Sequence, residues 1–178
     1  MQKRPEIGEF APYYLSYVNL VPEGDILHIL DEQIKLTIHL LQNISETQGQ
    51  FRYAPDKWSI KEVIGHMADT ERVMGYRLLC IARGDTVSLP GFNENAYVHN
   101  ASFDQQSMQD LLQNLNAVRQ STLHLIKSLN QEAWLRRGIA NNYEVTVLAL
   151  ATIMAGHELH HRQIIKERYM GSESYPLS

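Results

Sequence analysis

Three histidines, His157, His160 and His161, lie close together near the C-terminal end of the chain, in the stretch GHELHHRQI. Residues four positions apart in a helix share one face, so His157 and His161 can direct their imidazoles toward one point. Neutral imidazole is a good ligand for zinc, nickel, copper and iron. The spacing therefore predicts two ligands of a single divalent metal ion.

His66 is the candidate for the third ligand, because it lies in the middle of another predicted helix among mixed polar and apolar neighbours. A lone histidine in a helix is more often a core or surface residue, and the pair at 157 and 161 is what favours ligation. Three protein ligands would leave coordination positions open. Glu62 and Asp69, one turn on either side of His66, are candidate catalytic residues for proton transfer or ligand orientation.

The remaining histidines receive simpler interpretations. His160 also shares a face with His157, and we expect it beside the site or on the surface. The others occur singly and are expected to be structural or solvent-facing; they are His28, His39, His99 and His124. Among these four, His99 is the one whose loop position could bring it near a pocket.

A second interpretation of the same stretch is a zinc protease, because HELHH fits the pattern HExxH with Glu158 as the general base. Arg162 and Gln163 follow the second histidine directly, where proteases usually have uncharged or apolar residues. Little sequence remains after His161 to supply a further ligand. We therefore expect Glu158 on the helix surface or beside the ligands, and a protease is the less favoured alternative.

The elements that must position these side chains are four long amphipathic segments, with apolar residues at three- and four-residue steps. They span about residues 25–45, 59–83, 102–129 and 145–169, the third starting near Ser102 or Asp104. Ser59 followed by Glu62 is a capping-box pattern, and Gly84 suits the end of that helix. Residues 85–101 and 130–144 predict irregular connections without strands.

These patterns predict an all-α protein, a four-helix bundle in one domain of residues 1–178, with an N-terminal arm over 1–24 and the helical bundle over 25–170. Sixteen Lys and Arg against 20 Asp and Glu are scattered along the chain, so we expect no nucleic-acid or membrane partner. The single Cys80, among apolar neighbours, is expected to be a buried inert thiol. No apolar run resembles a signal peptide or a span, which favours a cytoplasmic location.

Two stretches resemble the motifs of a known family. DKWSIKEVIGHMADTER resembles a tryptophan-serine start of a helix that carries the first metal histidine, which places Trp58 and His66. GHELHHRQI resembles the final-helix motif of the same family, and Gln163 sets the choice of His161 over His160. Over about residues 26–169 the chain resembles the DinB-like metal-binding proteins, which include metal-dependent hydrolases of the YfiT type.

The resemblance implies an up-down-down-up bundle, a three-histidine site for a divalent metal such as zinc or nickel, and a homodimer. Some relatives transfer low-molecular-weight thiols such as bacillithiol or mycothiol, and others are hydrolases. It thus implies a metal-dependent transferase or hydrolase acting on a small-molecule substrate.

The alternative is a non-enzymatic metal-binding or stress-related interaction module. A cleft over a metal with free positions favours the enzyme, and a fourth protein ligand favours the module. Tyr97, Asn93 and Asn95 are candidate substrate contacts.

Overall fold

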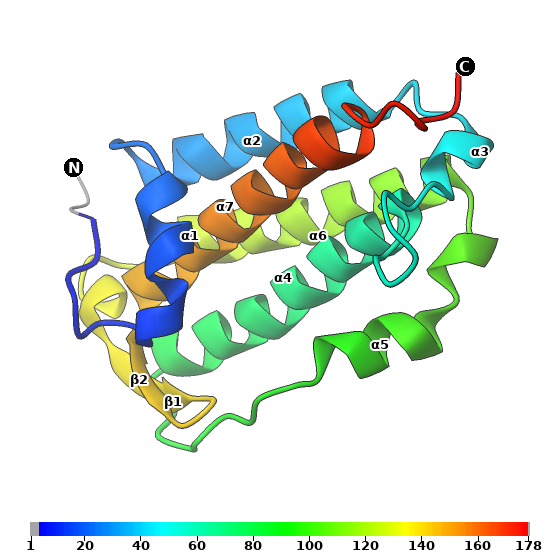
Figure 1. The fold of residues 1–178 in the computed structure, drawn as a ribbon. Coiled ribbons are helices and arrows are strands. Elements are labelled where there is room, and N and C mark those ends of the chain that lie inside the picture. Colours follow the sequence, from blue (N-terminus) through cyan, green and yellow to red (C-terminus); the bar gives the residue numbers. More distant parts are fainter. Residues whose placement is uncertain (1–3, 178) are drawn as a thin grey trace.

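The bundle consists of four long helices, seen in a computed structural model that describes residues 4–177. They are α2 (Ile26–Leu41), α4 (Ile60–Ala82), α6 (Met108–Lys127) and α7 (Val147–Ile164). Helices α2 and α7 run in one direction and α4 and α6 in the other (Figure 1). The expected all-α, up-down-down-up four-helix bundle is therefore confirmed.

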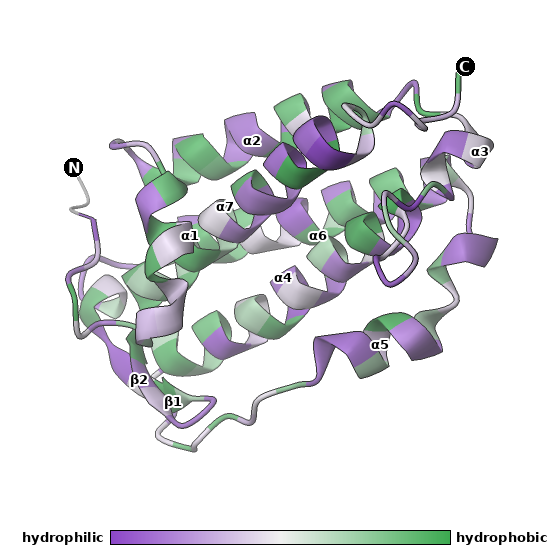
Figure 2. Ribbon diagram, viewed as in Figure 1, coloured by the Kyte–Doolittle hydropathy of each residue, from purple (hydrophilic) through white to green (hydrophobic). Residues whose placement is uncertain are grey.

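Each long helix turns its apolar face toward the others, and polar residues cover the outside (Figure 2). Helix α4 packs against α6 and α7, and α2 closes the bundle against the same two helices. The buried core is formed by aliphatic side chains such as Leu30, Ile64, Leu78 and Leu115. Burial of these faces is the main stabilising contribution, because each fully buried aliphatic side chain contributes about 1.5–3 kcal/mol.

The connection between α4 and α6 corrects two expectations. These neighbouring helices run in parallel, so the chain must return along the bundle before α6 can begin (Figure 1). The return contains helix α5 (Glu94–Ala101) and a 3-10 turn, η2 (Phe103–Gln105), where the sequence predicted an irregular loop up to residue 101. Ser102 adopts a left-handed conformation, and α6 begins at Met108 with Ser107 as its N-cap, so the predicted start near Ser102 or Asp104 was wrong.

The connection before α7 contains a β-hairpin, although no strand was expected. Strands β1 (Arg137–Ala140) and β2 (Tyr143–Thr146) pair antiparallel around a two-residue turn. Asn141 and Asn142 both have positive φ, at 51° and 66°. A two-residue hairpin turn of this kind favours asparagine, because its side chain tolerates the left-handed region.

The N-terminal arm folds onto the bundle as a 3-10 turn, η1 (Pro12–Tyr14), and helix α1 (Leu15–Leu20), which packs against α7. The first long helix ends at Leu41 rather than residue 45, because Ser45 caps the short helix α3 (Glu46–Gly49). A 3-10 turn, η3 (Ala133–Leu135), precedes the hairpin. One π-helical turn, η4 (Ile165–Tyr169), extends α7.

The start of α4 follows the predicted capping box. The Ser59 hydroxyl accepts a hydrogen bond from the backbone N–H of Glu62, and the Glu62 carboxylate accepts one from the N–H of Ser59. Gly84 follows the helix end with a φ of +86°, as expected for a terminating glycine. This cap fixes the register in which α4 presents His66 to the interior.

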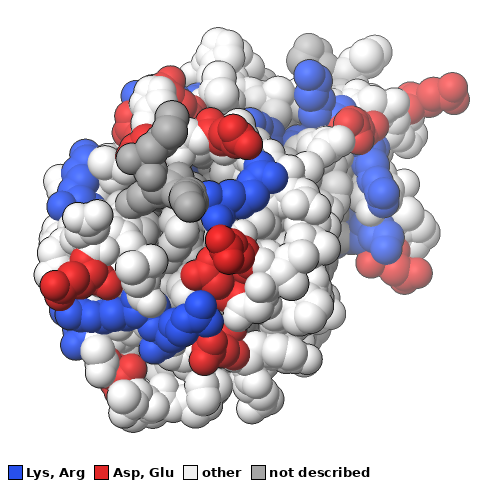
Figure 3. Space-filling model, turned by 90° about the vertical axis from the view of Figure 1, so that its left-hand side faces the viewer, with Lys and Arg blue, Asp and Glu red and all other residues white. Residues whose placement is uncertain are grey.

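The surface carries both signs of charge. Lys and Arg alternate with Asp and Glu across the end of the bundle shown in Figure 3, in agreement with the scattered charges of the sequence. In the described part of the chain, no helix combines the length and the apolar character needed to cross a membrane.

Candidate metal centre

The side chains of His66, His157 and His161 converge between α4 and α7. Nε2 of His157 lies 3.0 Å from Nε2 of His66 and 3.1 Å from Nε2 of His161. One nitrogen from each ring falls within 4.8 Å of the other two. His66 and His157 are buried and His161 is half-buried. The structure therefore brings together the three histidines that the sequence singled out.

The geometry of the three nitrogens suits a cation better than a hydrogen-bonded cluster. In a neutral imidazole, Nε2 has either one proton or one lone pair in the ring plane, so that of His157 cannot bond well to both neighbours. Three nitrogens at about 2.05 Å from a tetrahedral zinc would lie about 3.3 Å apart. The observed separations of 3.0 and 3.1 Å are close to this value. The donor set therefore fits a divalent metal.

Burial keeps the three histidines neutral, as metal ligation requires. Desolvation lowers the pKa of His66 to about 4. Burial, reinforced by neighbouring histidines, lowers the pKa of His157 and of His161 well below the usual value. The second ring nitrogen of His66 lies 3.4 Å from Thr70 Oγ1, one turn along α4, which helps to orient the ring.

Aromatic rings cover the cluster from two sides. The Trp58 ring lies 4.7 Å from the ring of His66, and the Tyr17 ring lies 5.6 Å from His157 and 5.1 Å from His160. His160 is half-buried against Tyr17, beside the three-histidine group and outside it. Tyr17 belongs to α1, within the predicted N-terminal arm of residues 1–24, and was not predicted as a neighbour of the site.

Close packing over the cluster depends on two glycines. A Cβ on Gly65 would lie 2.4 Å from the Phe103 ring, and one on Gly156 would lie 2.1 Å from the backbone oxygen of Tyr17. Real Cβ atoms do not approach other heavy atoms so closely. Each glycine directly precedes a histidine of the cluster, so it lets a covering segment approach the helix beside that histidine.

The two carboxylates proposed for catalysis have other contacts. Glu62 belongs to the capping box and accepts a hydrogen bond from Arg52 Nη1 at 2.5 Å. Asp69 pairs with Arg72 at 3.3 Å, and burial raises the pKa of Asp69 although Arg72 opposes the rise. Neither residue lines the cavity described below. Their catalytic roles stay predictions, and the contacts of Glu62 give it a structural role at the helix cap.

A buried ion-pair network lies next to the histidines. Of the two positions expected for Glu158, on the helix surface or beside the candidate ligands, the structure shows the second. Glu158 is 3% exposed; it accepts a hydrogen bond from Thr37 on α2, and its Oε2 lies 2.7 Å from Arg119 Nη2 on α6. Arg119, itself fully buried, also makes a bidentate pair with Glu71 on α4 at 2.7 Å and donates to the Leu30 carbonyl at 2.9 Å. The network therefore ties all four long helices together.

The charge of Arg119 is held by its two partners. Burial opposes that charge, but Glu71 and Glu158 overcome the opposition and raise the pKa of the guanidinium above its usual value. Neither Arg119 nor Glu71 was predicted from the sequence as a residue of the site. In the structure, Glu158 is buried in an ion pair.

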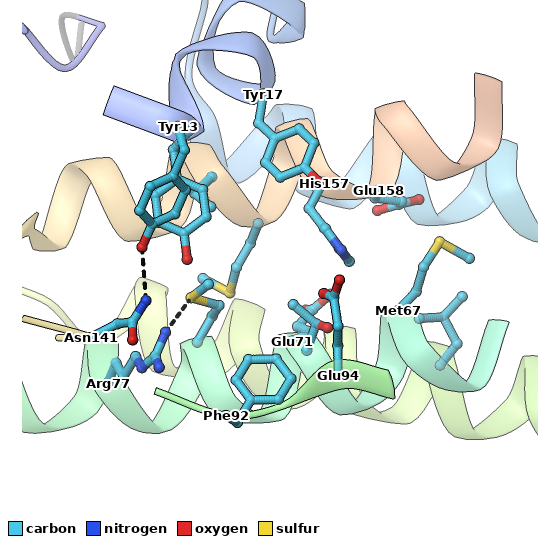
Figure 4. Close-up of a pocket in the computed structure, with 16 residues that line it drawn as sticks. Tyr13, Tyr17, Met67, Glu71, Arg77, Phe92, Glu94, Asn141, His157 and Glu158 are labelled. Carbon is cyan, nitrogen blue, oxygen red and sulfur yellow. Dashed lines mark hydrogen bonds between the residues drawn. The ribbon is translucent and has the colours of Figure 1, made fainter. Parts of the chain in front are cut away.

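A cavity of about 310 Å³ lies beside the cluster, between α1, α4, α7, the hairpin and the segment before α5. His157, Glu71 and Glu158 lie at one end, and Arg77 and Asn141 lie at the other (Figure 4). This volume is at the lower limit of ordinary small-molecule sites, which span roughly 300–1,000 Å³. The cavity connects one metal-ligand candidate to space that a small molecule can fill.

The loop residues chosen from the sequence have different positions from those expected. Asn93 caps α5 by accepting a hydrogen bond from the N–H of Ala96, and the half-exposed Tyr97 packs against Phe92. The cavity is lined by Phe92 and Glu94 rather than by Tyr97, Asn93 or Asn95. The expectation that this connection borders the site is thus met by neighbouring residues.

The other residues of interest lie away from the cluster. The four single histidines are exposed, as expected; they are His28, His39, His99 and His124. Cys80 is a free thiol and half-buried, less enclosed than the sequence suggested. Neither it nor these histidines line the cavity.

Two solved structures resemble the whole bundle. YfiT from Bacillus subtilis, described as a probable metal-dependent hydrolase with an unusual four-helix bundle topology, superposes with a TM-score of 0.75 and 18% identity over 93% of this chain and 95% of that chain. A DinB-like protein, YjoA, also from Bacillus subtilis, gives a TM-score of 0.59 and 21% identity over 86% and 96% of the two chains. At these identities the likeness shows the fold alone.

The sequence itself decides the family. A search of curated proteins found no match. The family model of the DinB superfamily matches residues 29–165. This range includes all three histidines and almost all of the four long helices. Together with the bundle topology and the convergent histidines, this match shows that the chain belongs to the DinB superfamily.

Proposed function

We propose that this protein is a divalent-metal-dependent enzyme, a hydrolase or a transferase, that acts on a small molecule. The observation that carries the proposal is the convergence of three histidine nitrogens, one of which belongs to His157 at the end of a cavity. His66, His157 and His161 are the proposed ligands. The description of YfiT as a probable metal-dependent hydrolase supports the same class of chemistry.

The proposed division of labour follows from the contacts. When bound, a divalent ion would supply Lewis acidity, which makes a nucleophile from water or a thiol near neutral pH. Thr70 would hold the ring of His66 in orientation, and Trp58 and Tyr17 would exclude bulk water from two sides. Substrate would enter through the cavity that His157 lines.

A closed structural metal site is less well supported. Among residues 4–177, no fourth histidine, cysteine or carboxylate joins the three nitrogens. Structural zinc sites usually have four protein ligands, whereas catalytic sites have three and keep one position open. This count favours an enzyme over a non-enzymatic metal-binding or stress-related module.

Finer aspects of the proposal come from the family resemblance. Zinc or nickel is the proposed ion, and a low-molecular-weight thiol is a proposed co-substrate for transfer. A cytoplasmic homodimer is proposed as well; exposed Tyr76 and Leu79 beside the groove between α4 and α6 offer apolar surface for self-association. Light scattering of the purified protein tests the dimer.

Metal binding is tested by loading the stripped protein with zinc or nickel and measuring bound metal after dialysis. We expect one ion per chain in the wild type. His66→Ala and His161→Ala should lose most of it, because two nitrogens hold an ion far more weakly than three. His160→Ala is the matched control, since His160 lies beside the group, and should keep the ion. Loss with His160→Ala but not with His161→Ala would contradict the assignment.

Activity is tested with stripped, zinc-loaded and nickel-loaded protein on ester and amide substrates and on thiol–electrophile pairs. Turnover should require the ion, and its pH profile should shift when the metal is exchanged, since different ions polarise their ligands to different degrees. Equal turnover by the stripped protein would refute the enzyme proposal. Tight metal binding without turnover would favour the non-enzymatic module.

A further inference from the structure

Arg77 is a buried cation without a buried counter-charge. Its side chain lines the cavity although the residue is only 3% exposed. Its guanidinium donates to two neutral acceptors, the Pro90 carbonyl at 2.7 Å and the Met74 sulfur at 3.5 Å, and lies 5.9 Å from the centre of the Phe92 ring. Among residues 4–177, no carboxylate lies within 4.0 Å of it. Burying an unpaired charge is costly, so the arrangement calls for an anion.

The contrast with Arg119 makes the missing partner of Arg77 informative. Arg119, equally buried in the same bundle, has two carboxylates at 2.7 Å. Arg77 projects instead into the cavity, whose space a ligand can occupy (Figure 4). The same fold therefore neutralises one buried arginine internally and leaves the other facing open volume.

Polar groups that can donate to an anion surround this end of the cavity. Asn141 Nδ2 donates to the Tyr13 hydroxyl at 3.0 Å, and that hydroxyl has one proton of its own to donate, either to neighbouring Tyr14 or to a ligand. Tyr14 lines the cavity nearby; burial, with Tyr13 beside it, raises the pKa of Tyr14 although Arg77 opposes the rise. The phenol of Tyr14 is therefore neutral at physiological pH and can act as a donor.

The backbone holds this end rigidly. Leu89 exchanges two backbone hydrogen bonds of 2.9 Å with the hairpin, through the Ile139 carbonyl and the Asn141 N–H. A Cβ on Gly91 would lie 2.2 Å from the side-chain oxygen of Asn141, so a larger residue there would force the Asn141 side chain to move. The arginine end is thus a built part of the cavity rather than a mobile loop.

The arginine end and the histidine end are separated along α4. Met67, Glu71, Met74 and Arg77 line the cavity at three- and four-residue steps, on one face of that helix. Six residues from Glu71, at the histidine end, to Arg77 correspond to about 9 Å of helix, at roughly 1.5 Å per residue. A molecule that spans the cavity would place one end near Arg77 and the other near His157.

We infer that the cavity binds an elongated small molecule whose carboxylate pairs with Arg77 and whose reacting group lies at the histidine cluster. The position of the reacting group at the histidine cluster rests on the proposed function, whereas the pairing of the carboxylate with Arg77 does not. Arginine binds a carboxylate through two parallel hydrogen bonds. The apolar side chains of Met74, Met154 and Phe92 suit an apolar or aromatic middle.

A monoanion fits better than a dianionic phosphate. Arg77 supplies one positive charge. Three carboxylates, those of Glu71, Glu94 and Glu158, line the same cavity. Among the described residues, Arg119 is the cation that pairs with Glu71 and with Glu158. A second negative charge on the ligand would meet repulsion without a further cation to offset it.

The experiment is isothermal titration at pH 7.5 with three probes of similar shape: 4-phenylbutanoate, its neutral amide, and 3-phenylpropyl phosphate. The variants are Arg77→Met and, as a matched control on an exposed arginine six residues further on, Arg83→Met. We expect the wild type to bind the carboxylate at least tenfold more tightly than the amide. Arg77→Met should abolish this preference and leave amide binding within twofold, while Arg83→Met should keep the preference.

Each contrary outcome is informative. Equal binding of carboxylate and amide by the wild type, or no binding of any probe up to 10 mM, would overturn the inference. Equal loss of both in Arg77→Met would show that Arg77 only anchors the Pro90 segment. Tighter binding of the phosphate would overturn the choice of a monoanion.

Metal-free and zinc-loaded protein are titrated in parallel. A carboxylate preference that appears only with zinc and survives Arg77→Met would place the carboxylate on the ion and overturn the inference. Failure of zinc to bind would refute the proposed function instead, while the metal-free titration still decides the role of Arg77.

Discussion

Replacing Arg119 by methionine should destabilise the bundle strongly, because the arginine is the common partner of two buried carboxylates. Glu71 and Glu158 are 5% and 3% exposed, and Arg119 is the cation that pairs with both. Methionine retains an apolar stem of similar length and removes the charge. The change therefore tests the ion pairs more than the packing.

The expected magnitude follows from the burial of the network. Removing one partner of a buried ion pair costs about 3–5 kcal/mol, because the charge left behind is unpaired in the interior. This is a large part of a typical free energy of unfolding of about 5–15 kcal/mol. For a domain of this size the midpoint of thermal unfolding should fall by about 6–20 °C. Lowering the pH should restore part of the loss, since protonation removes the buried negative charges.

Urea unfolding of the metal-free protein, followed by circular dichroism, measures the loss. The matched control is a triple variant, Arg119→Met with Glu71→Gln and Glu158→Gln, in which no charge is left unpaired. It should recover a substantial part of the stability. If Arg119→Met were as stable as the wild type, or if the triple variant were no better than the single one, unpaired charge would not be the cause.

Two further predictions concern the covering of the cluster and its protonation. Gly156→Ala should lower the free energy of unfolding by about 1–3 kcal/mol and speed hydrogen exchange in α1, because the new Cβ would lie 2.1 Å from the Tyr17 backbone oxygen. Gly75→Ala is the control. A Cβ there would have nothing nearer than 3.9 Å, so this variant should be as stable as the wild type or slightly more stable. Between pH 7.5 and 5, the free energy of unfolding of the metal-free protein should fall by about 2 kcal/mol because of His66 alone. The pKa of His66 is about 4 in the folded protein and about 6.5 in the unfolded chain. Its contribution to stability is therefore complete above pH 6.5 and is lost as the pH falls toward 4. Urea titrations at both pH values measure this, and an equal loss in His66→Asn would contradict it.

The long helices and the histidines could be predicted because their sequence patterns are local. Apolar periodicity marks each long helix, and the capping box at Ser59 marks the start of α4 to the residue. The spacing of His157 and His161 reports one helix face directly. Residue type and helical geometry are enough to predict that these two side chains converge, even before their partner on α4 is placed.

The short elements were missed for different physical reasons. Helix α5 has one buried residue, Val98, so it offers no apolar stripe to detect. The hairpin does carry a sign in the adjacent Asn141 and Asn142, a favourable pair for a turn with positive φ. Its strands are only four residues long, and this brevity masks their alternation.

The buried network and the cavity depend on contacts between distant segments, yet the sequence contains a trace of them. Arg119 stands four residues after Leu115 and Glu71 stands four residues after Met67, so each charge occupies an inward-facing position of its helix. A charged residue on an apolar stripe indicates a buried partner or a ligand. Arg77, three residues after Met74, belongs to the same group, and its partner differs because the cavity, not a carboxylate, lies opposite.

The two segments that cover the histidines are among those that the sequence did not predict, and in each case the covered histidine follows a glycine. Gly65 precedes His66 and admits Phe103 of the return segment; Gly156 precedes His157 and admits the backbone of α1. Each covering element is short because it crosses the ligand helix at one small residue and needs no long apolar face of its own. The cavity beside His157 offers a route to the cluster, and this route passes Arg77. Selection of the substrate by charge and positioning of its reacting group are therefore expected to occur along one path.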